Sequence, residues 1–157
     1  MTVILDSNVL LVAIGKSSKF RPIWERFVQG KIQIGLTQDI LQEYEEVLQE
    51  HSAPGAFEIV ANIFAESPDV FFKHIYYKWN IITADPDDNK FFDAAVACNA
   101  DYLVTNDKHF DIVKTIKFPN VSVCSADQFL KIIEGNNGWL LSCRDLGRTM
   151  DLLNHKS

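Results

Sequence analysis

The sequence predicts an α/β protein built as a three-layer α/β/α sandwich with a mostly parallel central sheet. Short apolar runs alternate along the chain with segments whose apolar residues recur at helical spacing, the order expected of βα units. Two apolar runs, residues 2–5 and 101–106, lead directly into Asp6 and Asp107. A buried parallel strand is apolar on both faces, and its carboxyl end delivers the acid to the edge of the sheet.

In the first half of the chain, strands and helices are predicted to alternate from the N-terminus. Phe20, Trp24 and Phe27 fall on one side of a helix that Gly30 ends. Thr37 is a good N-cap for the helix after the second strand, because its hydroxyl can accept a hydrogen bond from a free N–H. The expected elements are a strand at 2–5, helices at 7–14 and 20–29, a strand at 32–36, a helix after 37 and a helix at 56–65.

The second half begins with an aromatic stretch, residues 70–79, whose pattern leaves strand and helix end both open. Ser125 and Gln128 match a capping box for the last helix of the main domain. The further elements expected are a helix opening at 85–89, a strand at 102–105, a short helix at 107–114, a strand at 121–124 and a helix at 129–134. We expect one domain over residues 1–134 and a C-terminal helical extension over 135–157.

Four carboxylates are predicted to meet at one edge of the sheet. Asp6 and Asp107 end two strands, whereas Glu43 and Asp88 align with the apolar residues of their helices rather than with the solvated face. Open α/β sheets bind their ligands outside the carboxyl ends of the strands. Four acids in one crevice repel each other, so the pattern predicts a hard divalent cation, Mg²⁺ or Mn²⁺.

Composition narrows the classes of function. The net charge of −6 argues against a protein that coats nucleic acid, because that role usually requires a basic surface. It does not exclude a nuclease, since a bound metal ion offsets part of an acidic cluster and also holds phosphates. The three cysteines form no C-x-x-C pair, and the four histidines lack the spacing of a zinc site.

The sequence predicts no membrane segment. No apolar stretch approaches the roughly 20 residues that a membrane span needs. The apolar N-terminal run is interrupted by Asp6 and Asn8, and no basic segment precedes it as in a signal peptide. We therefore expect a cytoplasmic protein with no membrane partner.

Four motifs in order along the chain resemble those of PIN-domain ribonucleases. They are Asp6-Ser7-Asn8, the helical segment 37–44 with Glu43, the segment 85–91 with Asp88, and the segment 100–107 that ends in Asp107. The resemblance is nearest to the subgroup described as toxin components of toxin–antitoxin systems, and it covers residues 1–134.

The resemblance implies a site and a reaction. Its metal-binding and catalytic acids would be Asp6, Glu43, Asp88 and Asp107, with Asn8 and Thr105 orienting the carboxylates. One or two Mg²⁺ or Mn²⁺ ions would lower the pKa of a water that attacks a phosphodiester of single-stranded RNA. The partners implied are the RNA substrate, a possible cognate antitoxin protein and a second copy of the chain in a homodimer.

Each acid also has a structural alternative. Asp6 and Asp107 could cap the helices that follow them, and Asp88 could serve the positive end of its helix. Glu43 could pair with a surface lysine. Asp85 and Asp87 lie beside Asp88 in the sequence and could take its place in the site.

Three other classes of protein share part of this pattern. A phosphatase of the haloacid-dehalogenase type would need an acid two residues after Asp6, where Asn8 stands, and a receiver domain would need an acid beside Asp6. A non-catalytic PIN-fold scaffold that binds RNA or protein remains the alternative, because it would share the fold without the chemistry.

Overall fold

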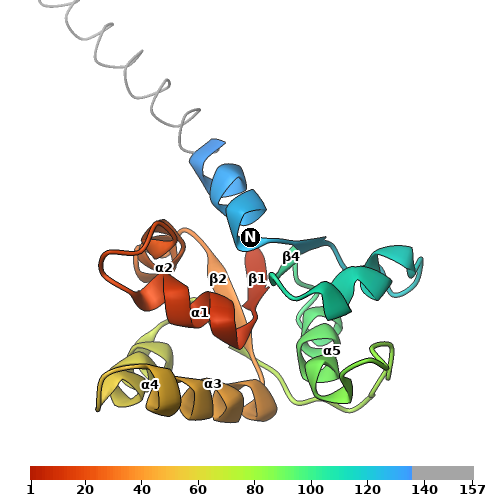
Figure 1. Cartoon of the computed structure of the whole chain (residues 1–157), viewed down its shortest axis with the longest axis horizontal. Coiled ribbons are helices and arrows are strands. Elements are labelled where there is room, and N and C mark those ends of the chain that lie inside the picture. Colours follow the sequence, from red (N-terminus) through yellow and green to blue (C-terminus); the bar gives the residue numbers. More distant parts are fainter. Residues whose placement is uncertain (136–157) are drawn as a thin grey trace, which may run out of the picture.

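The computed structural model of the protein describes residues 1–135. At its centre is a five-stranded sheet with all neighbouring strands parallel, in the order β3-β2-β1-β4-β5. The strands are β1 (Thr2–Leu5), β2 (Gln33–Leu36), β3 (Val70–Phe72), β4 (Tyr102–Val104) and β5 (Val123–Cys124). Helices lie on both sides of this sheet (Figure 1), which confirms the predicted three-layer α/β/α sandwich.

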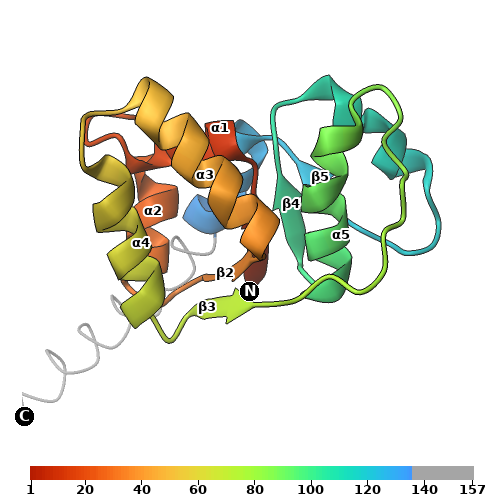
Figure 2. The same ribbon diagram turned by 90° about the horizontal axis from the view of Figure 1, so that it is seen from below.

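The helices divide unequally between the two sides of the sheet. They are α1 (Ser7–Ile14), α2 (Arg21–Val28), α3 (Gln38–His51), α4 (Ala56–Glu66) and α5 (Asn89–Ala97), with the 3₁₀ helices η1 (Pro86–Asp88) and η2 (Lys108–Thr115) and a last helix that starts at residue 126. Helices α1 to α4 gather on one side, whereas α5 and η2 lie on the other (Figures 1 and 2). Two predicted caps are confirmed: Thr37 accepts from the N–H of Ile40, and Ser125 and Gln128 exchange both bonds of the capping box.

The sheet and α5 approach each other closely at Gly35 in β2. A Cβ at this position would lie 2.5 Å from Cδ1 of Ile4 and 2.8 Å from Sγ of Cys98, distances that real side chains do not show. Cys98 directly follows α5. Glycine therefore lets the end of α5 rest on β1 and β2, and a larger residue at position 35 would push this helix away from the sheet.

The direction of chain progress reverses beside β1. From β1 the chain adds β2 and β3 on one side, and it then returns to place β4 and β5 on the other. A reversal of this kind opens a crevice at the carboxyl ends of the two strands that flank it. Asp6 follows β1 and Asp107 lies just beyond β4, so both acids stand at this crevice.

Three predictions of local structure are refined. Of the stretch 70–79, only Val70–Phe72 forms a strand, and residues 73–85 contain no helix or strand. The helix predicted to open at 85–89 begins with the 3₁₀ turn η1, and the short helix predicted near 107–114 is the 3₁₀ helix η2. A tight 3₁₀ turn suits these short connections because it needs few residues.

The predicted extension 135–157 lies, from residue 136 onward, outside the described residues. The extension and the boundary at residue 134 therefore stay predictions. Within residues 1–135, no helix is both long and apolar enough to cross a membrane.

Candidate metal centre

Thr105 links the two strand-end aspartates. The backbone N–H of Asp6 bonds to the carbonyl of Val104 at 3.0 Å, so the residue continues the pairing of β1 with β4. The hydroxyl of Thr105 donates to Oδ2 of Asp6 at 2.7 Å and accepts from the backbone N–H of Asp107 at 3.0 Å. Thr105 is itself buried. The predicted role of this side chain in orienting a carboxylate agrees with these contacts.

Glu43 reaches the same crevice from α3 and has two partners. Ser7 Oγ donates to its Oε1 at 3.0 Å, and the ammonium of Lys90 lies 2.8 Å from its Oε2. Lys90 also contacts Asp87 at 3.1 Å and is only 18% exposed. Burial lowers the pKa of Lys90, but its hydrogen bonds to Glu43 and Asp87 outweigh this effect and raise the pKa overall. The lysine is therefore held charged between two carboxylates.

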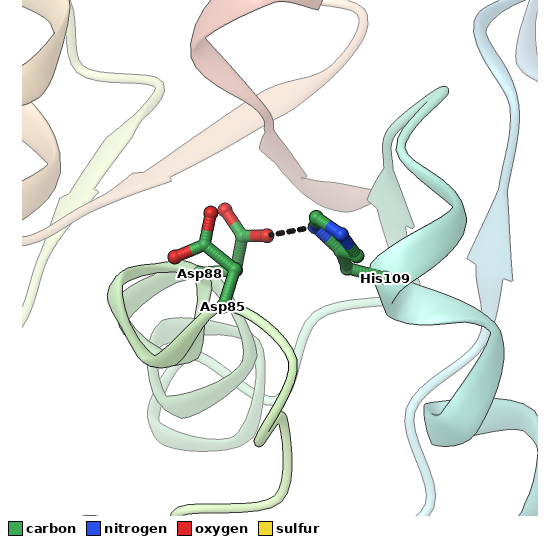
Figure 3. A group of neighbouring side chains, drawn as sticks. All are labelled: Asp85, Asp88 and His109. Carbon is green, nitrogen blue, oxygen red and sulfur yellow. Dashed lines mark ion pairs between the residues drawn. The ribbon is translucent and has the colours of Figure 1, made fainter.

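Asp88 faces His109 across the crevice (Figure 3). Oδ2 of Asp88 lies 3.4 Å from Nδ1 of the imidazole, and the same nitrogen lies 3.2 Å from Oδ1 of Asp107. The contact with Asp88 does not have hydrogen-bond geometry, so this buried oxygen has no hydrogen-bond partner among residues 1–135. A buried carboxylate oxygen without a partner is costly unless a ligand completes it.

The acids of the crevice influence one another electrostatically. Burial raises the pKa of Asp6; the charges of Glu43 and Asp107 raise it further, while the Thr105 hydrogen bond opposes them. Burial also raises the pKa of Asp88 to about 7, with additional contributions from Asp85, Asp107 and Asp6. Asp6 thus lies within range of the charges of Glu43 and Asp107, and Asp88 within range of those of Asp6 and Asp107.

One group of side chains is close enough to share a metal ion. Asp85, Asp88 and His109 each place one ligand atom within 4.8 Å of the others. The partnerless oxygen of Asp88 belongs to this group, the pKa of Asp88 itself is raised, and other carboxylates lie near it, so the donor set fits a divalent cation. The participation of Asp6, Glu43 and Asp107 as ligands is a prediction that these contacts leave open.

The sequence did not point to His109 or to Lys90. The histidine lacks zinc-site spacing in the chain, and it reaches Asp88 only because η2 turns back over the crevice. Its position two residues after Asp107 is the one signal that could have indicated it. Asp85, which the sequence left as a competitor of Asp88, lies beside Asp88 in the cluster, whereas Asp87 pairs with Lys90.

The structural alternatives for the acids have different outcomes. Asp6 makes no side-chain cap to α1, so the interpretation of Asp6 as a cap is wrong. Asp107 does cap η2, because Oδ1 accepts from the N–H of His109 at 2.9 Å, and capping leaves its second oxygen for another partner. Glu43 pairs with a lysine, but with the partly buried Lys90. Asn8 is exposed, and the hydrogen bonds within the cluster involve its neighbour Ser7 instead.

Comparison with known proteins identifies the family. A PIN domain model matches residues 2–109, and the chain therefore belongs to the PIN domain family. One similar solved structure is VapBC2 from Rickettsia felis bound to a DNA fragment from their promoter; the TM-score is 0.54 at 19% identity, over 80% of this chain and 98% of that one. Another is the T. brucei RRP44 PIN domain, with a TM-score of 0.55 at 16% identity, over 90% of this chain and 86% of that one. At such identities the likeness concerns the fold alone, and no curated protein matches the sequence.

Proposed function

We propose that the protein is a metal-dependent endoribonuclease that hydrolyses phosphodiesters of single-stranded RNA. The observation that carries this proposal is the buried Oδ2 of Asp88, which has no hydrogen-bond partner within residues 1–135 and lies close enough to the charges of Asp85, Asp107 and Asp6 for them to raise its pKa. A protein gains nothing in stability from such an arrangement, whereas a cation would complete it. Membership of the PIN domain family and the acidic cluster together support a nuclease.

Each residue at the crevice has a proposed role. Asp6, Glu43, Asp88 and Asp107 would hold Mg²⁺ or Mn²⁺, as one or two ions, with Asp85 and His109 at the same opening. A bound ion supplies a water of lowered pKa and neutralises charge on the phosphate. Thr105 holds Asp6 through its hydroxyl, and Ser7 holds Glu43. No side chain needs to act as the nucleophile.

We further propose that the protein is the toxin of a toxin–antitoxin pair, acting in the cytoplasm as a homodimer. The motifs resemble toxin components, and the likeness to a VapBC2 chain supports a partnership with a second, antitoxin protein. The fold is equally similar to that of the RRP44 PIN domain, and an RNA-processing role is the other possibility. Co-expression with the product of a small adjacent gene separates these possibilities, since only a toxin should be neutralised by it.

The direct test compares Asp88→Asn with Asp111→Asn. Both variants replace a carboxylate with an amide, but Asp111 is an exposed residue of η2 that, within residues 1–135, pairs only with Lys114. We expect the wild type and Asp111→Asn to cleave labelled single-stranded RNA with Mg²⁺ or Mn²⁺ and to stop when EDTA is added. Asp88→Asn should lose cleavage while remaining folded.

The rival function is a PIN-fold scaffold without catalysis. A wild type that binds RNA but never cleaves it with either ion would establish this rival. Equal cleavage by Asp88→Asn and the wild type would show that the reaction, if real, occurs elsewhere.

A further inference from the structure

An exposed aromatic segment runs from the edge of the sheet past α5. We define residues 72–79 as the aromatic strap. In Figure 2 the chain leaves β3, passes along α5 and then reaches η1. The backbone N–H of Lys73 bonds to Leu36 at 2.9 Å, and that of Trp79 bonds to Oδ1 of Asp93 on α5 at 3.1 Å. The strap is thus fixed at both ends although residues 73–79 have no regular secondary structure.

Along its length the strap presents aromatic rings to solvent. Tyr76 is 94% exposed, Tyr77 65% and Phe72 46%. One file of rings consists of Phe72, His74 and Tyr76. The ring centroids of the first two residues are 5.8 Å apart, and those of the last two are 6.4 Å apart. Single exposed apolar residues are ordinary, but a continuous file of rings on a fixed backbone indicates a binding surface.

The charges of the strap favour an anionic partner. Lys73 and Lys78 alternate with the rings, and both ammonium-bearing residues are exposed. The chain as a whole carries a net charge of −6, whereas residues 72–79 hold two lysines and no acid. Aromatic rings interleaved with lysines are the combination by which proteins hold single-stranded nucleic acid, with bases on the rings and phosphates on the cations.

Hollows beside the strap extend to one of the acids of the proposed site. A hollow of about 510 Å³ is lined by Tyr76, Lys78 and Asp39. A smaller hollow shares Lys78 and Asp39 with it and extends to Lys90, and a third hollow is lined by both Lys90 and Glu43. An extended strand can therefore follow a series of hollows from the exposed rings to Glu43.

We infer that the aromatic strap binds the bases of single-stranded RNA on one side of the bond to be cut, an inference that rests on the proposed function. The carboxylate of Asp39 in the hollow repels phosphates but accepts hydrogen bonds from base N–H groups, including the N3–H of uracil. Bases therefore face the hollow and the rings, and phosphates face Lys73 and Lys78. A second protein copy would also cover the rings, but the interleaved lysines favour the polyanion.

The test pairs Tyr76→Ala/Tyr77→Ala with Ile59→Ala, which removes a comparably exposed apolar side chain from α4. Binding of a fluorescent 12-nucleotide oligouridylate is measured by anisotropy in EDTA, where no cleavage occurs. We expect the double variant to bind at least about 5-fold more weakly and Ile59→Ala to bind like the wild type. With Mg²⁺, the double variant should show a raised KM on a 20-nucleotide RNA and an unchanged rate on bis(p-nitrophenyl) phosphate, which is too small to reach the strap.

The outcomes separate this inference from the proposed function. Weaker binding by the double variant supports the strap even if the wild type never cleaves RNA, a result that overturns only the nuclease. Equal binding by the double variant and the wild type, or no binding by the wild type, overturns the strap. A change from dimer to monomer in light scattering with RNA binding intact would show a protein interface there instead, and this also overturns the inference.

Discussion

Asp6 and Asp88 belong to one acidic cluster, but the protein offers them different surroundings. Asp6 receives a 2.7 Å hydrogen bond from Thr105, a residue held by the pairing of β4 with β5. Asp88 stands at the junction of η1 and α5, where its Oδ2 is buried without a hydrogen-bond partner in the described part of the chain. Both pKa values are raised, and that of Asp88 reaches about 7.

The two aspartates differ in whether the protein itself supplies a hydrogen-bond partner for their carboxylate oxygens. The half at β1 and β4 is fixed in advance by backbone pairing and a hydroxyl, so its geometry does not depend on a ligand. The half at Asp88 is satisfied only partly, by an imidazole 3.4 Å away. We expect mutations in the first half to alter activity through the geometry of the site, and changes around Asp88 to alter activity through the binding of the cation.

The largest effect is expected from Asp6→Asn. We expect cleavage to fall by more than ~100-fold, because loss of a ligand should exceed the 10–100-fold effect typical of groups that orient ligands. The amide can still accept from Thr105, and removal of one charge relieves repulsion by Glu43 and Asp107, so the melting temperature should be unchanged or raised. Gel assays and calorimetry check the two parts. A variant that unfolds readily would make Asp6 a structural residue.

Thr105→Ala should have the next largest effect. Removing the hydroxyl frees both Asp6 and the N–H of Asp107, so cleavage should fall by about 10–100-fold. Thr105→Ser keeps the hydroxyl and should retain most activity, although the lost methyl group costs some stability. Initial rates of the two variants at saturating Mn²⁺ decide the question. If serine is as poor as alanine, packing rather than the hydrogen bond explains the loss.

The response to pH should sharpen the contrast at Asp88. In the folded protein the pKa of Asp88 is about 7, above the ordinary value of 3.8. Between pH 3.8 and pH 7, Asp88 therefore carries a proton in the folded state that it has released in the unfolded state. The metal-free protein should therefore lose stability from this group as pH rises toward 7, and Asp88→Asn should abolish that loss. A cation must displace the same proton at pH 6 but not at pH 8. We expect the Mn²⁺ concentration that half-saturates the melting shift to be about tenfold higher at pH 6. An equal requirement at both pH values would place the ion away from Asp88.

The smallest effect is expected from Lys90→Gln. This lysine pairs with Glu43 and Asp87. Its removal should lower the free energy of unfolding of the metal-free protein by about 1–3 kcal/mol and strengthen Mn²⁺ binding a few-fold. Lys114→Gln is the matched control, because Lys114 forms an exposed i,i+3 pair with Asp111 that contributes about 0–1 kcal/mol. Denaturant unfolding with and without Mn²⁺ measures both quantities. Weaker Mn²⁺ binding by Lys90→Gln would show that the lysine supports the site instead of competing with the ion.

Sequence patterns predicted the sheet and its helices well, because their causes are local. The buried strand runs, the Thr37 cap and the Ser125–Gln128 capping box depend on neighbouring residues, and all three are confirmed. The segment after Phe72 resisted prediction for a physical reason: its aromatic residues suit a strand, but β3 is at the edge of the sheet and the chain beyond it has no strand to pair with.

The candidate metal centre could be predicted only in outline. The carboxyl edge of a parallel sheet brings Asp6 and Asp107 together whatever the side chains do, so topology alone placed them. The approach of His109 to Asp88, and of Lys90 to Glu43, depends on the direction of single side chains from elements far apart in sequence. No spacing rule encodes such contacts, and for this reason they were missed.

β4 pairs with β1 although the two strands lie far apart in the sequence. β1 is therefore synthesised well before this part of the sheet can form. Thr105 stands 99 positions after Asp6, so β1 leaves the ribosome long before its neighbour on that side exists. An incomplete chain carries Asp6 and Glu43 but not the hydroxyl that orients Asp6, and it lacks His109 as well. On the proposed function, a nascent chain thus stays inert toward the RNA of the ribosome that makes it until translation has passed β4.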